Sequence, residues 1–390
     1  MSPEDKLILS CVKIKPSPAE LDQLNLLIPL VEDWDYLVNT IIGRGIAPLL
    51  YVKLSLLANS HLIPKSITAK LQQSYYITLS RSTILYEHFR LIAGQFTSKG
   101  IELITLKGIY LSESLYKDIG LRQMSDIDLL VKPEDGEKAL AALAGMGYKS
   151  TGVDESDSDV KYGEVVHYTP LVLNGVAIEV HIKLHQDNER YRVHVDELWK
   201  NATQVLVNNI QVSTLNTYDL LIHTCIHLDK HFQQGHVQFT CFSDVTNLLE
   251  KNVEALDWTI LVNTCKQYNC EIEVFKYIVL VNKYMQATVP TEIIKKYSYS
   301  LTVNEEELFF KYLSGFIGFT TGMHRHFGNF QHITSFSDKI KYFWKIIFPS
   351  KKFMMTKFQV KSSGLVYLYY PYRYYLGIKG VYILIRKKLK

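Results

Sequence analysis

The stretch "LKGIYLSESLYKDIGLRQMSDIDLLVKPED", Leu106 to Asp135, contains two alternating aspartates in an otherwise apolar segment. In a β-strand, residues i and i+2 face the same side, so Asp126 and Asp128 would lie side by side, with apolar residues facing the other way. Two carboxylates that close raise each other's pKa unless a cation lies between them. The stretch therefore predicts a strand with a cation site, although an aspartate pair alone also fits solvated residues at a strand end.

A second predicted strand, "AIEVHIKLH", carries a third carboxylate. Glu179, His181 and Lys183 share one face of this strand, and apolar residues occupy the other. Mg²⁺ prefers carboxylate oxygens, keeps several waters and is completed by substrate phosphates. Three carboxylates on adjacent strands can hold two such ions, which clamp the attacking and leaving oxygens of a phosphoryl displacement.

Basic and flexible residues precede the aspartates. Lys107 and Gly108 end a β-branched run and open a short helical stretch. Gly108 lets the backbone come close to a ligand, and the N-terminus of the helix offers free N–H groups to an anion. Arg122 would either neutralise a polyphosphate or form a simple ion pair with the strand carboxylates.

The periodicity of apolar residues divides the chain into four parts. Residues 1–95 predict a helical cap, with helices at Ala19–Val31, Trp34–Ile42 and Ile67–Ser98. Residues 96–198 predict a small α/β core that includes a hairpin at Asn174-Gly175. Residues 199–338 return to a helical pattern, and residues 339–390 form a tail. The fold class expected is α+β, a small mixed sheet with flanking helices between N-terminal and C-terminal helical regions.

Composition is that of a globular protein, with 47% hydrophobic and 21% charged residues. No run of 18 or more apolar residues occurs, and the first residues lack the pattern of a secretory signal. The five cysteines do not form the paired CxxC motifs of a structural zinc site. We therefore expect a soluble cytoplasmic protein with reduced thiols.

Charge is unevenly distributed along the chain. From Lys339 onward there are thirteen Lys and Arg residues and no Asp or Glu, although the net charge of the whole chain is only +4. The tail also contains many aromatic residues, a mixture that favours packing on the helical region, peripheral membrane contact or nucleic-acid contact. Packing is the first interpretation, and membrane contact is the second.

Three histidines recur every four residues in the predicted helix "TYDLLIHTCIHLDKHF". His223, His227 and His231 would share one face, and with Asp244 they could bind zinc or iron. The alternative, which we favour, is that they are polar residues packed where the helical region meets the cleft.

The order strand, Lys107-Gly108, helix, Arg122 and Asp126-Ile-Asp128-Leu-Leu-Val resembles bacterial "nucleotidyltransferase family" proteins. These form a largely uncharacterised branch of the polymerase-β-like nucleotidyltransferase superfamily. The segments "GIAPLLYVKL", "IEVHIKL" and "LLIHTCIHLDKH" with "SDVTNLL" extend the resemblance over most of the chain. Most of the superfamily carries Gly-Ser where this chain has Lys107-Gly108.

The resemblance implies a polymerase-β-like core that transfers a nucleoside monophosphate from an NTP to a hydroxyl and releases pyrophosphate. The acceptor would be a small molecule, a glycan precursor or a protein. Asp126, Asp128 and Glu179 would be the catalytic residues and would bind Mg²⁺, or Mn²⁺ in its place. The residues implied in substrate binding are Lys107, Gly108, Arg122, His181, His227, Lys230 and His231.

Two other functions remain open. The chain could keep the fold as a nucleotide-binding or scaffold protein with weak or no turnover. It could also be an adaptor that docks a membrane or nucleic acid through its basic tail.

Overall fold

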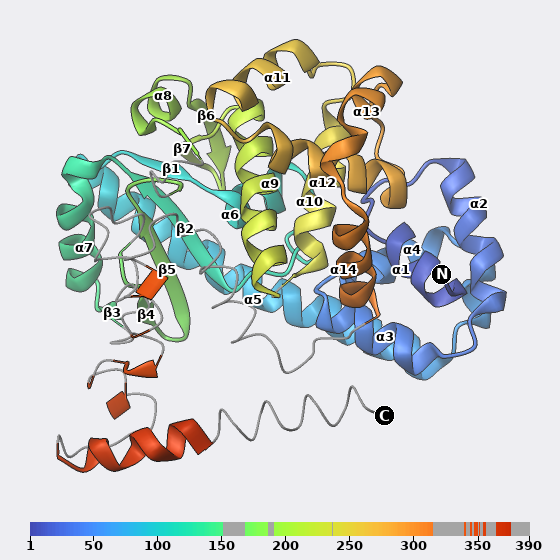
Figure 1. The fold of residues 1–390 in the computed structure, drawn as a ribbon, viewed down its shortest axis with the longest axis horizontal. Coiled ribbons are helices and arrows are strands. Elements are labelled where there is room, and N and C mark those ends of the chain that lie inside the picture. The colour runs from blue at the N-terminus through green and yellow to red at the C-terminus, as the bar shows by residue number, and fades with distance from the viewer. Residues whose placement is uncertain are drawn as a thin grey trace.

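The computed structural model describes residues 1–150, 168–185, 191–235, 237–314 and, between 339 and 375, residues 339, 340, 344, 347–349, 351, 354, 355 and 364–375. The expectations for most of the basic tail therefore lie outside the described residues. The described part is a mixed α/β structure in which helices flank one seven-stranded sheet (Figure 1).

The helices in the first 200 residues are α1 (Pro3–Ser10), α2 (Pro18–Leu27), α3 (Trp34–Gly43), α4 (Ala47–Lys53), α5 (Lys65–Ser98), α6 (Lys107–Ser114), α7 (Gly136–Gly145) and α8 (Val195–Lys200). The later helices are α9 (Thr217–Gln234), α10 (Phe239–Lys251), α11 (Trp258–Gln267), α12 (Glu271–Met285), α13 (Thr291–Tyr297) and α14 (Val303–Leu313). The three predicted N-terminal helices are confirmed as α2, α3 and α5.

The strands are β1 (Leu103–Thr105), β2 (Asp126–Val131), β3 (Lys149–Ser150), β4 (Leu171–Leu173), β5 (Val176–His181), β6 (Thr203–Val207) and β7 (Ile210–Thr214). Their order in the sheet is β3-β4-β5-β2-β1-β7-β6. The pairs β2–β5 and β1–β7 are parallel, and the other neighbours are antiparallel. The predicted Asn174-Gly175 hairpin is confirmed: it joins β4 to β5, and both turn residues have positive φ.

The prediction that residues after 199 are helical was wrong for residues 203–214. These residues form the β6–β7 hairpin, which extends the sheet because β7 pairs in parallel with β1. Its turn residues Asn208 and Asn209 have φ of 49° and 61°, a conformation that asparagine tolerates better than most residues. Alternating valines and the Asn-Asn pair were the hairpin signal in this segment.

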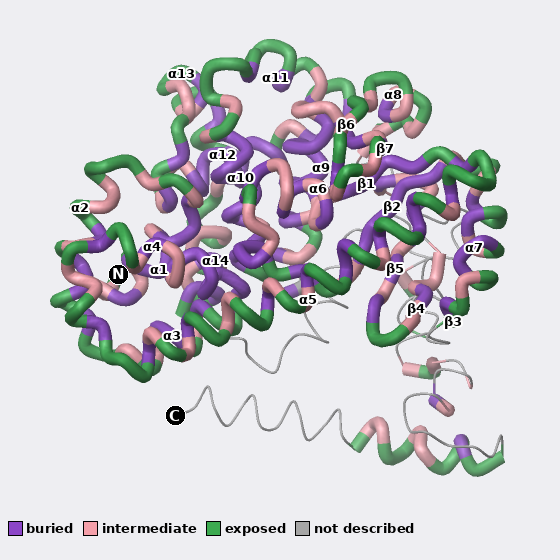
Figure 2. Tube along the Cα trace, turned by 180° about the vertical axis from the view of Figure 1, so that it is seen from behind, coloured by how far each residue is buried: buried purple, intermediate pink, exposed green. Residues whose placement is uncertain are grey.

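One face of the sheet packs on the C-terminal half of α5 and on α7. Ile127, Leu129 and Ile178 belong to this apolar core, together with Phe89 and Phe96 of α5. Ile127, Leu129 and Ile178 alternate with the carboxylates along β2 and β5. Strand alternation therefore directs the carboxylates to the opposite face of the sheet. β2 is buried along its length after Asp126 (Figure 2).

A second, larger core lies on the other side. It combines residues of the N-terminal helices with those of α9, α10 and α12, and it reaches the sheet at Ile104 and Leu130. The 34-residue helix α5 joins the two cores, since Ile67 and Leu71 near its start belong to the second core and its later turns to the first (Figure 1). The domain boundaries at 95, 198 and 338 stay predictions.

All five cysteines are free thiols. Within the described ranges, no single helix is both long and apolar enough to cross a membrane. The pair formed by Trp34–Gly43 and Ala47–Leu56 passes on length and composition, but it is bent by 120°.

Lys53 in α4 is 1% exposed, and its Nζ donates to the carbonyl oxygens of Cys11 and Leu49 at 2.6 and 3.2 Å. Burial lowers the pKa of Lys53 from its ordinary value of 10.5 to about 8. Between these pH values the unfolded chain binds a proton that the folded chain does not. Folding stability from Lys53 should therefore rise with pH, by about 2 to 3 kcal/mol.

Urea unfolding of the wild type and of Lys53→Met at pH 7.5 and pH 10 checks this expectation. The stability of the wild type relative to the variant should increase at the higher pH. An equal difference at both pH values would contradict a lowered pKa for Lys53.

Candidate active site

The register of two strands from distant parts of the chain brings the acidic residues together. β2 and β5 run in parallel, and Asp128 lies directly beside Glu179. In the same pairing Asp126 lies beside Ala177, and Leu130 lies beside His181. Because neighbouring residues of paired strands share a face, Asp126, Asp128, Glu179 and His181 all lie on the side away from α5 and α7.

The carboxylate cluster, defined as Asp128, Glu179 and His181, has one ligand atom of each residue within 4.8 Å of the others. Nε2 of His181 donates to Oδ1 of Asp128 at 3.0 Å and lies 3.5 Å from Oε2 of Glu179. Asp128 is 7% exposed and His181 is 6% exposed. Among the described residues this is the one set of three such side chains within reach of a single ion, and Asp126, at the start of the strand, lies outside it.

Lys107 is the cation nearest the cluster. It follows β1 as the first residue of α6, and its Nζ lies 3.2 Å from Oδ2 of Asp128. Its φ of 34° is in the left-handed region that favours glycine, so the backbone holds a conformation that is costly for lysine. At Gly108 an added Cβ would lie 2.9 Å from Sδ of Met124, so any larger residue would have to displace the Met124 side chain.

The pKa values of these groups depend on one another. Burial would raise the pKa of Asp128, but Lys107 and His181 outweigh it and hold that pKa well below its usual range. Burial would likewise lower the pKa of Lys107 and of His181, but the carboxylates raise both. Asp126 is different: burial, together with repulsion from Asp128 and Glu179, raises its pKa to about 6. The site therefore carries negative charge that Lys107 does not fully compensate.

This donor set fits a divalent cation. Asp128 and Glu179 supply the oxygens that Mg²⁺ and Mn²⁺ prefer, and Asp126 lies one row away on the same face. The imidazole of His181 adds a nitrogen donor, which Mn²⁺ or another transition ion accepts more readily than Mg²⁺.

We expect the affinity of the protein for Mg²⁺ to rise between pH 5 and pH 8. At low pH a proton on Asp126 competes with the ion, and protonated His181 repels it. With a pKa of about 6 for Asp126, the affinity at pH 5 should be about tenfold lower than at pH 7. Isothermal titration with MgCl₂ across this range measures the change.

Two variants assign the pH dependence of metal binding. Asp126→Asn should flatten it below pH 6, and His181→Gln should flatten it above pH 6.5. An affinity of the wild type that does not change with pH would contradict the assignment.

Arg122 does not contact the strand carboxylates, so the expectation of a simple ion pair with them was wrong. Its Nε and Nη2 bind Oδ1 and Oδ2 of Asp244 in α10 at 2.9 and 2.7 Å, and both side chains are buried. Tyr116 also donates to Oδ1 of Asp244, at 2.8 Å. Because Asp244 neutralises Arg122, this arginine holds α10 against the segment that precedes β2.

The histidines of α9 lie on the side of the sheet that carries the cluster. Burial, and after it the positive charge of Lys107, lowers the pKa of His223 and of His227 well below the usual range, while Asp128 acts in the opposite direction. The rings of His227 and His231 are 4.3 Å apart. Lys230, on the same helix, is exposed and helps to lower the pKa of His185.

His185 and His223 were not identified from the sequence as candidate binding residues. His185 follows β5, and its ring centroid lies 5.4 Å from that of His223. The spacing of histidines every four residues already placed His223 on the same helix face as His227. From the sequence, however, only a packing role or a zinc or iron site was considered for His223. Asp244, the carboxylate proposed for that metal site, is bound to Arg122 instead.

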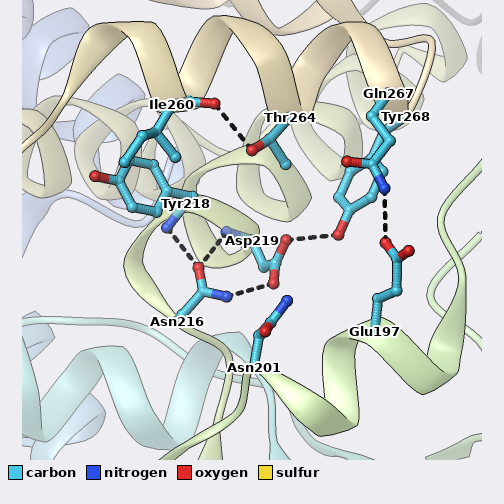
Figure 3. A pocket seen from close by; sticks show the side chains of 9 residues that line it. All are labelled: Glu197, Asn201, Asn216, Tyr218, Asp219, Ile260, Thr264, Gln267 and Tyr268. Carbon is cyan, nitrogen blue, oxygen red and sulfur yellow. Dashed lines mark hydrogen bonds between the residues drawn. The ribbon is translucent and has the colours of Figure 1, made fainter.

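A separate surface pocket of about 380 Å³ lies between α8, the start of α9 and α11 (Figure 3). Asn216 accepts from the backbone N–H groups of Tyr218 and Asp219, and the carboxylate of Asp219 accepts from Asn216 and Tyr268. These groups satisfy one another, and none belongs to the carboxylate cluster. We therefore place the candidate active site at the cluster and not at this pocket.

Comparison with known proteins gives one finding for this chain. A family model described as "Uncharacterised nucleotidyltransferase" matches residues 31–286, a range that includes Lys107, Arg122, the carboxylate cluster and the histidines of α9. No curated protein and no solved structure matches the chain.

Proposed function

Because the chain belongs to the uncharacterised nucleotidyltransferase family, we propose that it transfers a nucleoside monophosphate from an NTP to a hydroxyl acceptor. The acceptor oxygen forms a bond to the α-phosphorus, and the bond from that phosphorus to the bridging oxygen of the β-phosphate breaks. Pyrophosphate leaves, and the proton of the acceptor passes to Glu179. The sheet that supports this chemistry is, in this proposal, a polymerase-β-like core.

Asp126, Asp128 and Glu179 would hold Mg²⁺ or Mn²⁺, with His181 as an additional nitrogen ligand. When bound, the metal neutralises charge that develops on the phosphates. Lys107 supplies a second positive charge beside Asp128, and Gly108 lets the α6 backbone approach the phosphates. Lys107 has a left-handed φ at the position where most of the superfamily carries glycine. This shared backbone conformation supports a phosphate-binding role for the turn.

One observation carries the proposal. The pairing of β2 with β5 places Asp128 beside Glu179, 51 positions apart in the sequence, on a face that a purely structural strand would fill with apolar residues. Burying acidic groups is costly unless a cation or hydrogen bonds compensate them. Lys107 and His181 compensate Asp128, but the raised pKa of Asp126 indicates that part of this cost remains, and a bound cation would offset it.

Transfer of label from the four α-³²P-labelled NTPs, with MgCl₂ or MnCl₂, tests the function. Hydroxyl compounds and the protein itself serve as acceptors, and pyrophosphate release is followed in parallel. The wild type should release pyrophosphate, and Glu179→Gln should bind NTP without release. If the wild type binds none of the four NTPs in calorimetry, the proposed function is wrong.

Nucleotide binding without turnover is the second candidate. Both oxygens of Asp128 already bind positively charged or donating groups, Lys107 and His181. If these contacts persist when NTP is bound, Asp128 cannot serve fully as a metal ligand. NTP binding with no pyrophosphate release for any acceptor would favour this candidate over transfer.

A further inference from the structure

A row of imidazoles extends from the carboxylate cluster along α9. His185 lies next to His223, with ring centroids 5.4 Å apart, and His223 is 6.2 Å from His227. His231 continues the row at 4.3 Å from His227. The α9 members recur every four residues, so they share one face of the helix.

His223 is the exceptional member of this row. It is 3% exposed, and among the described residues neither of its ring nitrogens has a hydrogen-bond partner. Other buried polar side chains of α9 are bonded: Thr224 donates to the carbonyl of Leu220, and Asp219 accepts from Tyr268. An unsatisfied buried polar group costs stability, so its presence requires a reason such as a ligand.

The charges around His223 favour an anion. Lys107 helps to lower the pKa of His223, and Lys230 and Lys107 help to lower that of His185 to about 3, in each case after burial as the largest cause. The imidazoles of His185 and His223 are therefore neutral, and each presents one N–H donor. Two lysines and neutral N–H donors on one side of a carboxylate cluster form a surface suited to phosphate oxygens.

A metal ion fits this row poorly. Among the described residues, no set of three ligand side chains within reach of one ion includes His223 or His227. The positive charges of Lys107 and Lys230 also oppose a cation at this position. The row of imidazoles therefore suits an anion, and the neighbouring carboxylate cluster suits a cation.

We propose that His223 donates a hydrogen bond to the polyphosphate chain of the bound nucleotide, beside Lys107, on the α9 side of the site. This inference rests on the proposed function, because it names how that site holds its substrate. It makes His223 a binding residue for NTP and for the pyrophosphate product.

The probe that tests it is inorganic tripolyphosphate with MgCl₂, which removes the unknown base preference. Calorimetry should give an affinity for His223→Leu about 10- to 100-fold below that of the wild type, the scale of one hydrogen bond to a charged group. His223→Gln, which keeps an N–H donor, should recover part of the affinity.

Stability separates this role from packing. Leucine removes two unsatisfied nitrogens, so His223→Leu should raise the midpoint of thermal unfolding while it weakens binding. His88→Leu is the matched control: His88 bonds Tyr148 at 2.6 Å, so its loss should lower the midpoint and leave the affinity unchanged.

The outcomes are distinct. Equal tripolyphosphate affinity of wild type, His223→Leu and His223→Gln would overturn the inference, even if nucleotidyl transfer is observed. Loss of NTP affinity alone, with tripolyphosphate unaffected, would also overturn it, since His223 would then contact the base or sugar. Tripolyphosphate binding that depends on His223 in a protein that binds no NTP would overturn both the proposed function and the inference, because the ligand of His223 would then not be a nucleotide. No binding of tripolyphosphate by the wild type would overturn the inference.

Discussion

Replacing Asp128 by asparagine is expected to reduce nucleotidyl transfer roughly 10³-fold, the scale of losing one preorganised electrostatic group. Asp128 is the carboxylate at the centre of the site: it lies beside Glu179 and contacts both Lys107 and His181. Asparagine keeps its shape but removes the charge that a metal ion requires. Label transfer from α-³²P-NTP and calorimetry with MgCl₂ measure the two losses.

The same substitution should also destabilise the protein, because it leaves Lys107, whose side chain is only 13% exposed, without its ion-pair partner. The expected cost is about 3 kcal/mol in the free energy of unfolding. The double variant Lys107→Met, Asp128→Asn removes both charges, so it should recover most of the stability and stay inactive. If Asp128→Asn keeps wild-type transfer, the carboxylate cluster is not the active site.

Replacing Asp244 by alanine is expected to lower the free energy of unfolding by about 3 to 5 kcal/mol, the scale of breaking a buried ion pair. Arg122 donates to this carboxylate through both Nε and Nη2, and Tyr116 donates to it as well. Asp244 is 2% exposed, so its loss leaves the arginine charge buried and uncompensated. Urea unfolding at pH 7 measures the change.

Two controls identify the ion pair as the cause. Tyr116→Phe removes the hydroxyl that contacts Asp244 and Ser243 but keeps the ion pair, and it should cost about 1 kcal/mol. Arg122→Met with Asp244→Leu removes both charges and should be much more stable than Asp244→Ala. A decrease below 1 kcal/mol for Asp244→Ala would contradict this account.

This ion pair also affects the active site. A Cβ added at Gly108 would lie 3.2 Å from Nη1 of Arg122, so the arginine packs against the Lys107-Gly108 turn. We expect Asp244→Ala to weaken tripolyphosphate binding as well, because the turn loses a support that fixes its position. The sequence offered Arg122 as a phosphate contact or as a partner of the strand carboxylates; the structure pairs it with Asp244, and a contact with phosphate stays a prediction.

Local patterns in the sequence sufficed for several features. Alternation placed Asp126 and Asp128 on one face of a strand, and the Asn174-Gly175 pair defined a hairpin, because both depend on residues that are neighbours in the chain. The β6–β7 hairpin was missed because its Asn-Asn turn lies in a segment whose surroundings are helical. The partner of Arg122 was missed because two carboxylates close in sequence seemed better candidates than one 122 positions away.

The sequence by itself determined the chemistry available to this protein: three carboxylates in strand-forming segments, a Lys-Gly turn before them, and histidines on one helix face. Tertiary structure alone decided which of these groups meet. The parallel register of β2 and β5 places His181 beside Asp128 and Glu179 in the carboxylate cluster. The packing of α9 against the sheet places His223 next to His185. The physical reason is that spacing along the chain fixes only which face a side chain takes, whereas strand register and the packing of two apolar cores fix which faces come together.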